Sequence, residues 1–512
     1  FGEMTAWLKE HEEIRQELFT AIKPEHDDVG AVLALFNQLR KEFPKQIEKY
    51  AHLAIATSVV WDGRGRGVYD YEHHQRRTHS YLPENMLEAI DNFRYFLDTE
   101  NVMQGRAQFL PWEFLVFLID HRTPLAERQW ALNGYGNRRS MFGRCYQDVP
   151  YDTEMLETSS RVCRLDGKDY SLPNILSFGG VCAMQADFAA RVGKSIGVPS
   201  AYVGGESRSG DLHAWVMWVE LLDVKPGRIR FSLESHGRYR GDRYYVGTLY
   251  DPQTGIRITD RELERRLQAS GVNAVACRHA DLLMRAWPLL RDEGSLNVTQ
   301  QLQLLWDVIS ISPGNAEPWA ELAKISSSEE LNRDQRRMMV RSLDKLFVTF
   351  AGFPDFTWTV FDDLIRYEKE LKVRNQLYER LIGLYDAASR PDLASTARLK
   401  LADYQVEEGK PEAAIAGLAG TILRYVDEGR YVPLMLDRLE AIHREQKGND
   451  AEIVAFYQQF LPKIPRKRGD SPSKYCQQMY RRAIALFDKA GRDDLAATLR
   501  VELDKLQSSS SR

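Results

Sequence analysis

Strand-forming sequence is confined to one internal stretch of the chain, and this restricts the folds available to it. Short runs rich in Val, Ile, Tyr, Phe and Trp occur only from about residue 136 to 270, among them SAYVGG, HAWVMWVELL, RIRFSLES and DRYYVGTLYD. Turn formers such as DVKPGR separate these runs, and a helix of small residues precedes them. One helix followed by several strands is the order expected of an α+β domain.

Helical patterns flank this stretch on both sides. From about residue 1 to 135, apolar residues recur at three- and four-residue intervals, as in DVGAVLALFNQLRKEF. The Gly-rich stretch WDGRGRGVYDYEHHQRR interrupts the pattern, and we expect its His73 and His74 to be solvated. The sequence therefore predicts an N-terminal helical region (1–135), an α+β core (136–270) and a C-terminal helical region (271–512).

The C-terminal region carries a weak internal repeat. Its segments pair a turn containing Gly with a helix, in most cases rich in Ala and Leu, and the turn residues Gly409, Gly448 and Gly491 are 39 and 43 residues apart (448 − 409 and 491 − 448). This spacing is typical of stacked helical hairpins. The segments PGNAEPWAEL and EEGKPEAAIAGL resemble tetratricopeptide-type repeats, and a plain helical bundle is the alternative.

Charge and hydropathy exclude some partners. The 512 residues carry 69 Lys and Arg against 73 Asp and Glu, a net charge of −4, so no basic excess points to nucleic acid or an anionic membrane as the main partner. No run of about 18 apolar residues suggests membrane insertion. We expect a soluble protein. The chain begins at Phe1, which fits removal of a signal peptide or simple trimming, so the cytoplasm and the bacterial periplasm or cell envelope both stay open.

The cysteines are few and scattered, at positions Cys145, Cys163, Cys182, Cys277 and Cys476. They form no disulfide framework and no CxxC pair, although one bridge between Cys145 and Cys163 is an alternative. A zinc site would have to draw on Cys163, Cys182, His213 and His236, whose spacings match no known ligand pattern. We therefore expect neither a metal nor a cofactor.

One cysteine lies in a sequence that suits a nucleophile. In GGVCAMQADFAARVGKSIGVPS, two glycines let the backbone approach a neighbour, and Cys182 falls in the first turn of a helix, where free N–H groups and the helix dipole favour a thiolate. A small core residue is the alternative. His213 opens the apolar run HAWVMWVELL 31 residues later (213 − 182) and is the candidate base.

These motifs together resemble a known family. GGVCAMQADFAARVGKSIGVPSAYVGG followed by GDLHAWVMWVEL is similar to the core of the transglutaminase-like superfamily, which has a papain-like α+β fold, over residues 120–260. The upstream PLAERQWALNGY is similar to bacterial members. The resemblance implies that Cys182 is the nucleophile, that His213 is the base, and that an acid on a following strand orients the imidazole.

Two residues are candidates for that acid. Glu234 lies in RIRFSLES, the first strand-like run after the histidine, and hairpin geometry favours it. Asp251 lies one strand later and matches the Asp-Pro sequence that is usual in the family. We prefer Glu234. A member of the family without a properly placed acid would have slow chemistry or none.

Two classes of function follow from the sequence. The first is a cysteine enzyme that acts on an amide bond of a peptide or protein through a thioester, either as a protease or amidase or as an acyltransferase that forms a crosslink. The second is a catalytically silent scaffold or adaptor that binds a protein partner through its helical repeats.

Overall fold

A computed structural model describes residues 2–64, 71–105, 107–136, 145–206, 212–225, 228–235, 238–239, 242–243, 246–294, 296–328, 330–446, 450–468 and 471–508. Contacts divide the chain into two compact units. Unit 1 consists of Phe1–Gly205, His213–Gly237 and Val246–Leu322, and unit 2 of Glu206–Leu212, Arg238–Tyr245 and Ala323–Arg512.

The first helices of unit 1 surround α4 (Ala51–Val60), in which every residue except His52 is buried. Its sequence AHLAIATSVV places small and apolar side chains on almost every face, so neighbours pack on all sides. Those neighbours are α2 (Glu12–Ala21), α3 (Val29–Glu42), α6 (Ala89–Thr99) and α7 (Trp112–Ile119). This part also contains α1 (Gly2–Glu10), α5 (Glu72–Thr78), the 3-10 helix η1 (Glu100–Val102) and α8 (Leu125–Tyr135).

The second buried helix of unit 1 is α12 (Cys182–Ser195), in which every residue after Cys182 is buried. Its small side chains allow close packing by α8 and by α9 (Cys145–Asp148) and α11 (Leu172–Phe178), and α10 (Thr153–Glu157) completes this group. The helix ends before Gly197, which has a φ of 84°. The N–H of Val198 donates to the Gly193 carbonyl at 2.8 Å, as in helices that end at a left-handed glycine.

The two glycines before Cys182 are needed for a close backbone approach. Gly179 has a φ of 83°, and a Cβ at this position would clash with the carbonyl oxygen of Pro150. The N–H of Gly180 donates to the Pro150 carbonyl, and the N–H of Asp152 donates to the Gly180 carbonyl, each at 3.0 Å. The backbone is therefore fixed at the point where α12 begins.

A five-stranded sheet has the order β3-β2-β1-β6-β7. Its strands are β1 (Ser200–Glu206), β2 (Leu212–Lys225), β3 (Arg228–Glu234), β6 (Gly247–Tyr250) and β7 (Arg257–Thr259). The pairs β2–β3, β1–β6 and β6–β7 are antiparallel. Two short strands, β4 (Arg238–Tyr239) and β5 (Asp242–Arg243), pair with each other.

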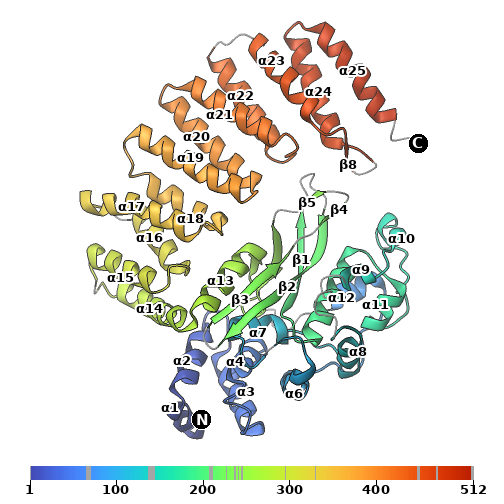
Figure 1. The fold of residues 1–512 in the computed structure, drawn as a ribbon, viewed down its shortest axis with the longest axis vertical. Helices are drawn as coiled ribbons and strands as arrows, with labels where there is room; N and C mark the ends of the chain where they lie inside the picture. The colour runs from blue at the N-terminus through green and yellow to red at the C-terminus, as the bar shows by residue number, and fades with distance from the viewer. Residues whose placement is uncertain are drawn as a thin grey trace. The chain divides into compact units, whose positions relative to one another are not determined.

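The two faces of the sheet pack against different helices (Figure 1). Alternate residues of β2, Ala214 and Val216, belong to the apolar cluster around α12. On the opposite face lies α13 (Asp260–Val272), and Trp215 points towards it. Unit 1 continues with α14 (Ala274–Asp292), α15 (Val298–Ile311) and the first half of α16 (Glu317–Ser328).

Unit 2 is mainly a series of helices in which each packs against the next. They are α17 (Arg333–Thr349), α18 (Pro354–Ile365), α19 (Leu371–Ala387), α20 (Pro391–Glu407), α21 (Pro411–Arg424), α22 (Val432–Glu445), α23 (Asp450–Phe460), the 3-10 helix η3 (Leu461–Lys463), α24 (Lys474–Lys489) and α25 (Asp493–Ser508). The strands β8 (Lys467–Arg468) and β9 (Ser471–Pro472) form a small hairpin between α23 and α24.

Ion pairs join alternate helices of this series. Arg380 of α19 pairs with Asp344 of α17, Arg424 of α21 with Asp386 of α19, and Arg438 of α22 with Asp403 of α20. The partners are 36, 38 and 35 residues apart (380 − 344, 424 − 386 and 438 − 403). This recurrence fits helical hairpins stacked in sequence, although such exposed pairs add little stability.

The coarse fold prediction is confirmed. The molecule is α+β, with its five-stranded sheet built from the expected stretch and with helices before and after it. No helix in the described ranges is both long enough and apolar enough to cross a membrane. The likeness to transglutaminase-like and tetratricopeptide families stays a prediction.

Candidate active site around Cys182

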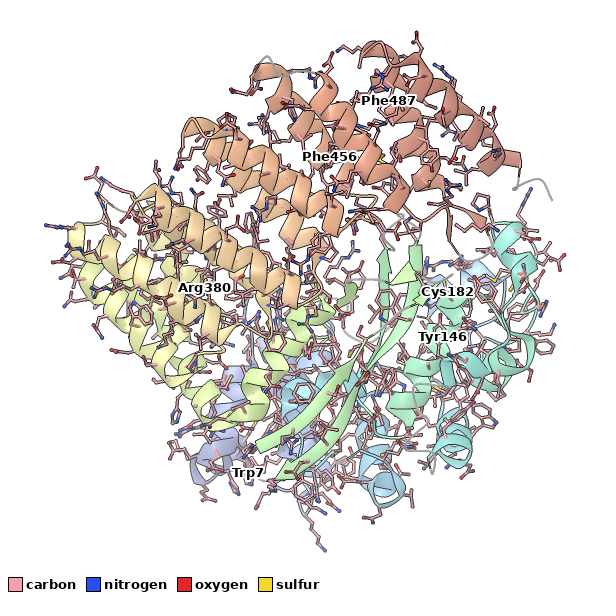
Figure 2. The ribbon with its side chains drawn as sticks, turned by 45° about the horizontal axis from the view of Figure 1, so that its top comes forward. Trp7, Tyr146, Cys182, Arg380, Phe456 and Phe487 are labelled. Atoms are coloured by element: carbon pink, nitrogen blue, oxygen red, sulfur yellow. The ribbon has the colours of Figure 1, made fainter. Side chains whose placement is uncertain are left out.

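The Cys182 side chain lies at the start of α12 and contacts the backbone of β2. It is partly exposed, and its sulfur accepts a hydrogen bond from the N–H of Ala214. The hydroxyl of Tyr146, on α9, donates to the carbonyl of the same Ala214 at 2.8 Å. Figure 2 labels Cys182 and Tyr146 beside the sheet. Helix and strand therefore meet at one residue, the neighbour of His213.

This contact exists because β3 is shorter than β2. The ladder between them ends at the pair Trp218 and Glu234. The N–H of Val219 donates to the Pro199 carbonyl on the β1 side, so the even-numbered residues of β2 direct their backbone groups towards β3. In the described part of the sheet no β3 residue pairs with Ala214. Its N–H group therefore bonds to Cys182, and its carbonyl group accepts from Tyr146.

The environment of the thiol keeps it protonated at rest. Burial raises the pKa of Cys182, while the N–H of Ala214 and the positive charge of Arg77 lower it by smaller amounts. A thiol of this kind needs a base to become a nucleophile.

His213 is buried at the start of β2 with 8% of its surface exposed. Its ring centroid lies 5.9 Å from that of Trp215 and 6.4 Å from that of Tyr146. Burial lowers the pKa of His213 to about 4, so the imidazole is neutral at physiological pH and able to accept a proton. The neutral thiol thus contacts the residue that follows the neutral imidazole in β2.

Glu234 lies well away from His213. Its partner in the ladder is Trp218, five positions along β2 from the histidine (218 − 213), or about 17 Å at the usual strand rise. Because opposite residues share a face, Glu234 lies with Trp218 on the α12 face, whereas His213 belongs to the other face. The hydroxyl of Ser232 donates to the Glu234 carboxylate at 2.6 Å.

Asp251 is occupied in the turn after β6. Its Oδ1 accepts the backbone N–H groups of Gln253 and Thr254, each at 3.0 Å, and its Oδ2 lies 3.2 Å from Nη1 of Arg266 on α13. These contacts are typical of an aspartate that fixes a turn. Glu234 therefore has contacts set by the strand register, and Asp251 has contacts set by its turn. The catalytic roles of both acids stay predictions.

A buried carboxylate that the sequence analysis did not single out lies behind Trp215. The indole N–H of Trp215 donates to Ser235 at 3.0 Å, and the Ser235 hydroxyl donates to Asp260 at 2.5 Å. Asp260 also accepts the N–H of Gly247 at 3.1 Å, and burial raises its pKa. The sequence TDRE signals a helix start at this position, but only the fold brings the carboxylate beneath the ring next to His213.

The expectation that His74 is solvated is wrong. This residue is 3% exposed, and its ring lies against those of Tyr202 (5.2 Å between centroids) and Tyr170 (6.4 Å). Burial lowers its pKa. The polar sequence around it concealed a short amphipathic helix, α5, that packs beside β1. The expected exposure of His73 is correct.

The structure also tests the disulfide and the zinc site considered for the cysteines. All five cysteines are free, so the bridge between Cys145 and Cys163 is not formed. Among the residues that the structure describes, no three His, Cys, Asp or Glu side chains are arranged to hold a metal ion. His236, a member of the zinc alternative, lies outside the described residues.

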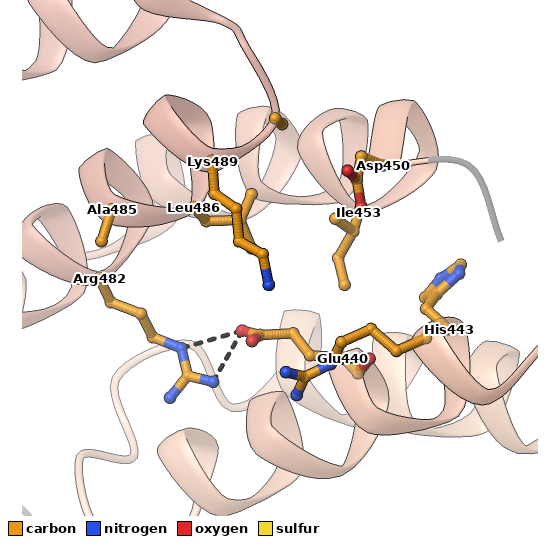
Figure 3. A pocket seen from close by; sticks show the side chains of 10 residues that line it. Glu440, His443, Asp450, Ile453, Arg482, Ala485, Leu486 and Lys489 are labelled. Atoms are coloured by element: carbon orange, nitrogen blue, oxygen red, sulfur yellow. Dashed lines mark hydrogen bonds and ion pairs between the residues drawn. The ribbon is translucent and has the colours of Figure 1, made fainter. Parts of the chain in front are cut away.

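Unit 2 contains a cavity of about 310 Å³ between α22, α23 and α24 (Figure 3). Ile453 and Leu486 form an apolar part of its wall, and Lys489 points into it. On one side Arg482 is paired with Glu440 at 2.7 Å. The cavity therefore combines an apolar surface with charged groups, as a binding site for a short peptide segment would.

Comparison with known proteins gives no relative. No protein-family model matches the chain, and neither does any curated protein or any solved structure. The site is therefore interpreted from its own residues.

Proposed function

We propose that the chain is a cysteine enzyme, transglutaminase-like in its site, that acts on an amide bond of a peptide or protein. The observation that carries this proposal is the hydrogen bond from the N–H of Ala214 to the sulfur of Cys182. It joins a partly exposed thiol at a helix start to the strand that carries His213, a buried and neutral imidazole.

The chemistry needs two steps. In the first, His213 takes the thiol proton, the Cys182 sulfur bonds to the carbonyl carbon, and the C–N bond breaks as the proton passes to the leaving amine. The backbone N–H groups of Cys182 and Ala183, at the start of α12, are the proposed donors to the oxyanion. In the second step the thioester passes its acyl group to water, giving hydrolysis, or to an amine, giving a new amide. Glu234 and Asp251 are the proposed alternatives for the acid that orients the imidazole.

Labelling of Cys182 tests this proposal. Iodoacetamide at pH 7 is expected to modify Cys182 much faster than the other four cysteines, each of which is at most 7% exposed. His213→Asn is expected to slow this labelling by at least tenfold, because general-base assistance is worth at least that much. Trp130→Phe, a conservative change elsewhere in the same core, is the control. Equal labelling of the native protein and His213→Asn would refute the role of His213.

The fate of the acyl group requires a second assay. A glutamine-containing protein is incubated with the chain and a fluorescent primary amine, and both amine incorporation and new amino termini are measured. Incorporation indicates acyl transfer, and new amino termini indicate peptide hydrolysis. Neither product should form with Cys182→Ala.

The cavity in unit 2 supports a second candidate function, a scaffold that binds an acidic peptide segment. Arg444 and Lys489 line the cavity, and within the described part of unit 2 neither makes an ion pair. A fluorescent polyglutamate peptide should bind the full chain, and Lys489→Ala should weaken binding. Lys474→Ala, on the same helix but away from the cavity, should not. Binding that persists in Cys182→Ala, without labelling of the native thiol, would favour the scaffold.

A further inference from the structure

A short helix that the sequence analysis did not consider supplies a face to the Cys182 site. His74 and Arg77 are three residues apart on α5, so their side chains lie on the same face. The His74 ring packs against Tyr202 of β1, 5.2 Å between centroids. Tyr202 and Cys182 both pack against the apolar cluster around α12. Through Tyr202, this face of α5 contacts the same apolar cluster as the thiol.

The guanidinium of Arg77 is held from one side. Its Nε donates to the hydroxyl of Ser160 at 3.1 Å. Ser159 and Ser160 both have positive φ angles, 53° and 67°, which non-glycine residues adopt at a cost. The Ser160 hydroxyl on this turn accepts the Nε–H of Arg77, and the two Nη groups take no part in that bond.

These Nη groups are unused. Within the described residues they make no hydrogen bond and no ion pair. The adjacent Arg76 differs, because it is more exposed and forms a 2.7 Å ion pair with Glu72. Burial raises the pKa of Cys182, Tyr202 and Cys163, and the positive charge of Arg77 is a smaller, opposing effect at all three.

We propose that Arg77 binds a carboxylate of the substrate next to the amide bond that Cys182 attacks. A guanidinium offers two parallel N–H groups that match the two oxygens of a carboxylate, and Ser160 already holds it in one orientation. Peptides carry such anions as Asp or Glu side chains or as a terminal carboxylate. The substrate class is thus an acidic peptide, and this inference rests on the proposed cysteine chemistry.

A pair of alkylating reagents separates substrate binding from thiol activation. Iodoacetate and iodoacetamide have the same leaving group, but only iodoacetate carries a carboxylate. The ratio of their rates with Cys182, iodoacetate over iodoacetamide, is expected to fall at least tenfold in Arg77→Gln. Arg77→Lys should recover only part of it, because a lysine keeps the charge without the paired N–H groups. Arg76→Gln, the neighbouring control, should leave the ratio unchanged.

Two results would overturn the inference. One is an equal slowing of both reagents in Arg77→Gln, which would mean that the arginine acts on the thiol alone. The other is an unchanged ratio in a variant whose circular dichroism and melting temperature match the native protein. An Arg77→Gln chain that does not fold is replaced in this test by Arg77→Lys, for which an unchanged ratio likewise counts against the paired contact.

A binding measurement tests the carboxylate site at Arg77 without a reactive thiol. N-acetylglutamate, a small amide that carries carboxylates, is titrated by calorimetry into Cys182→Ala with and without Arg77→Gln. The second substitution is expected to weaken binding at least tenfold, and equal binding would refute the carboxylate site. If the native thiol reacts with neither reagent while this binding depends on Arg77, the anion site stands and the cysteine-enzyme proposal fails.

Discussion

The sulfur of Cys182 accepts a hydrogen bond from the backbone N–H of Ala214, the residue that follows His213. The donor belongs to the strand backbone, so its position beside the thiol is set by the fold and not by a side-chain rotamer of β2. In the proposed mechanism the fold positions the nucleophile, and His213 takes the thiol proton.

The pH dependence of Cys182 alkylation should show that the resting thiol of Cys182 and the imidazole of His213 are both neutral. Burial raises the pKa of Cys182 and lowers that of His213 to about 4, so a thiolate paired with imidazolium is disfavoured between these values. The rate with iodoacetamide is expected to rise steadily from pH 5 to 9. A flat rate between pH 4 and 7 would indicate a stable ion pair and contradict this prediction.

Substitution of the acids should discriminate among their roles. Glu234→Gln is expected to change the alkylation rate of Cys182 by less than about twofold, because its register separates it from His213 by about 17 Å. Asp251→Asn should lower the melting temperature, since it weakens a buried turn and the pair with Arg266. A loss of rate in Glu234→Gln at unchanged stability would restore it as the orienting acid.

Asp260→Asn should act on Trp215 rather than on the thiol. The Ser235 hydroxyl that now donates to Asp260 would face an amide, and the indole next to His213 would lose a fixed neighbour. We expect a shift in tryptophan fluorescence and at most a modest change in alkylation. An unchanged spectrum would show that this chain of hydrogen bonds does not hold the ring.

Local signals in the sequence were sufficient for α12 and for the strands β1, β2, β3 and β6. The glycines before Cys182, the small residues after it and the Gly-Val-Pro stop all act within a few residues, so the helix begins and ends where they indicate. The strand runs were likewise found from β-branched and aromatic residues.

The face of Glu234 could not be predicted from the same signals. Counting back from the turn, Val224 pairs with Ile229, and an unbroken ladder would set Glu234 opposite Val219, on the face of His213. A bulge between Leu221 and Asp223 shifts the register by one, which moves Glu234 to the other face. No turn or glycine in the sequence marks this bulge.

The positions of His74 and Arg77 depend on tertiary packing. Their helix has seven residues and lies in a polar stretch, so periodicity gives little information. Their place comes from contacts with β1 and with the turn at Ser160, far away in sequence. Only the folded chain shows that α5 packs on Tyr202, which shares an apolar cluster with Cys182.

The buried pair of Arg191 and Glu127 should dominate the stability of the α12 region. Their side chains are 1% and 9% exposed, the Nη2 to Oε2 distance is 2.8 Å, and Glu127 also accepts the N–H of Leu172. Glu127→Ala leaves a buried guanidinium without this partner and is expected to cost about 3–5 kcal/mol, measured as a lower urea midpoint by circular dichroism. The control is the exposed ion pair of Arg76 and Glu72, for which Glu72→Ala should cost less than about 1 kcal/mol. Equal costs would show that water reaches Arg191.

Stability should fall as the pH rises from about 4.5 to 7 because of Glu113. Burial on α7, together with the carboxylates of Glu17 and Asp281, raises its pKa to about 7, and the hydroxyl of Ser270 donates to it at 3.0 Å and lowers the pKa by a smaller amount. The unfolded chain loses this proton near the ordinary value of 4.5, whereas the folded chain keeps it until about 7. The contribution to stability is therefore complete below pH 4.5 and is lost as the pH rises through 7.

Glu113→Gln should remove this dependence, because the amide stays neutral and can still accept from Ser270. Between pH 5.5 and 8.5 the melting temperature of the native protein is expected to fall more than that of the variant. Glu25→Gln, an exposed control in the same unit, should follow the native protein at both values. Parallel melting curves for Glu113→Gln and the native protein would mean that water or a nearby cation already stabilises the Glu113 carboxylate, and the buried acid would then have no part in the pH response.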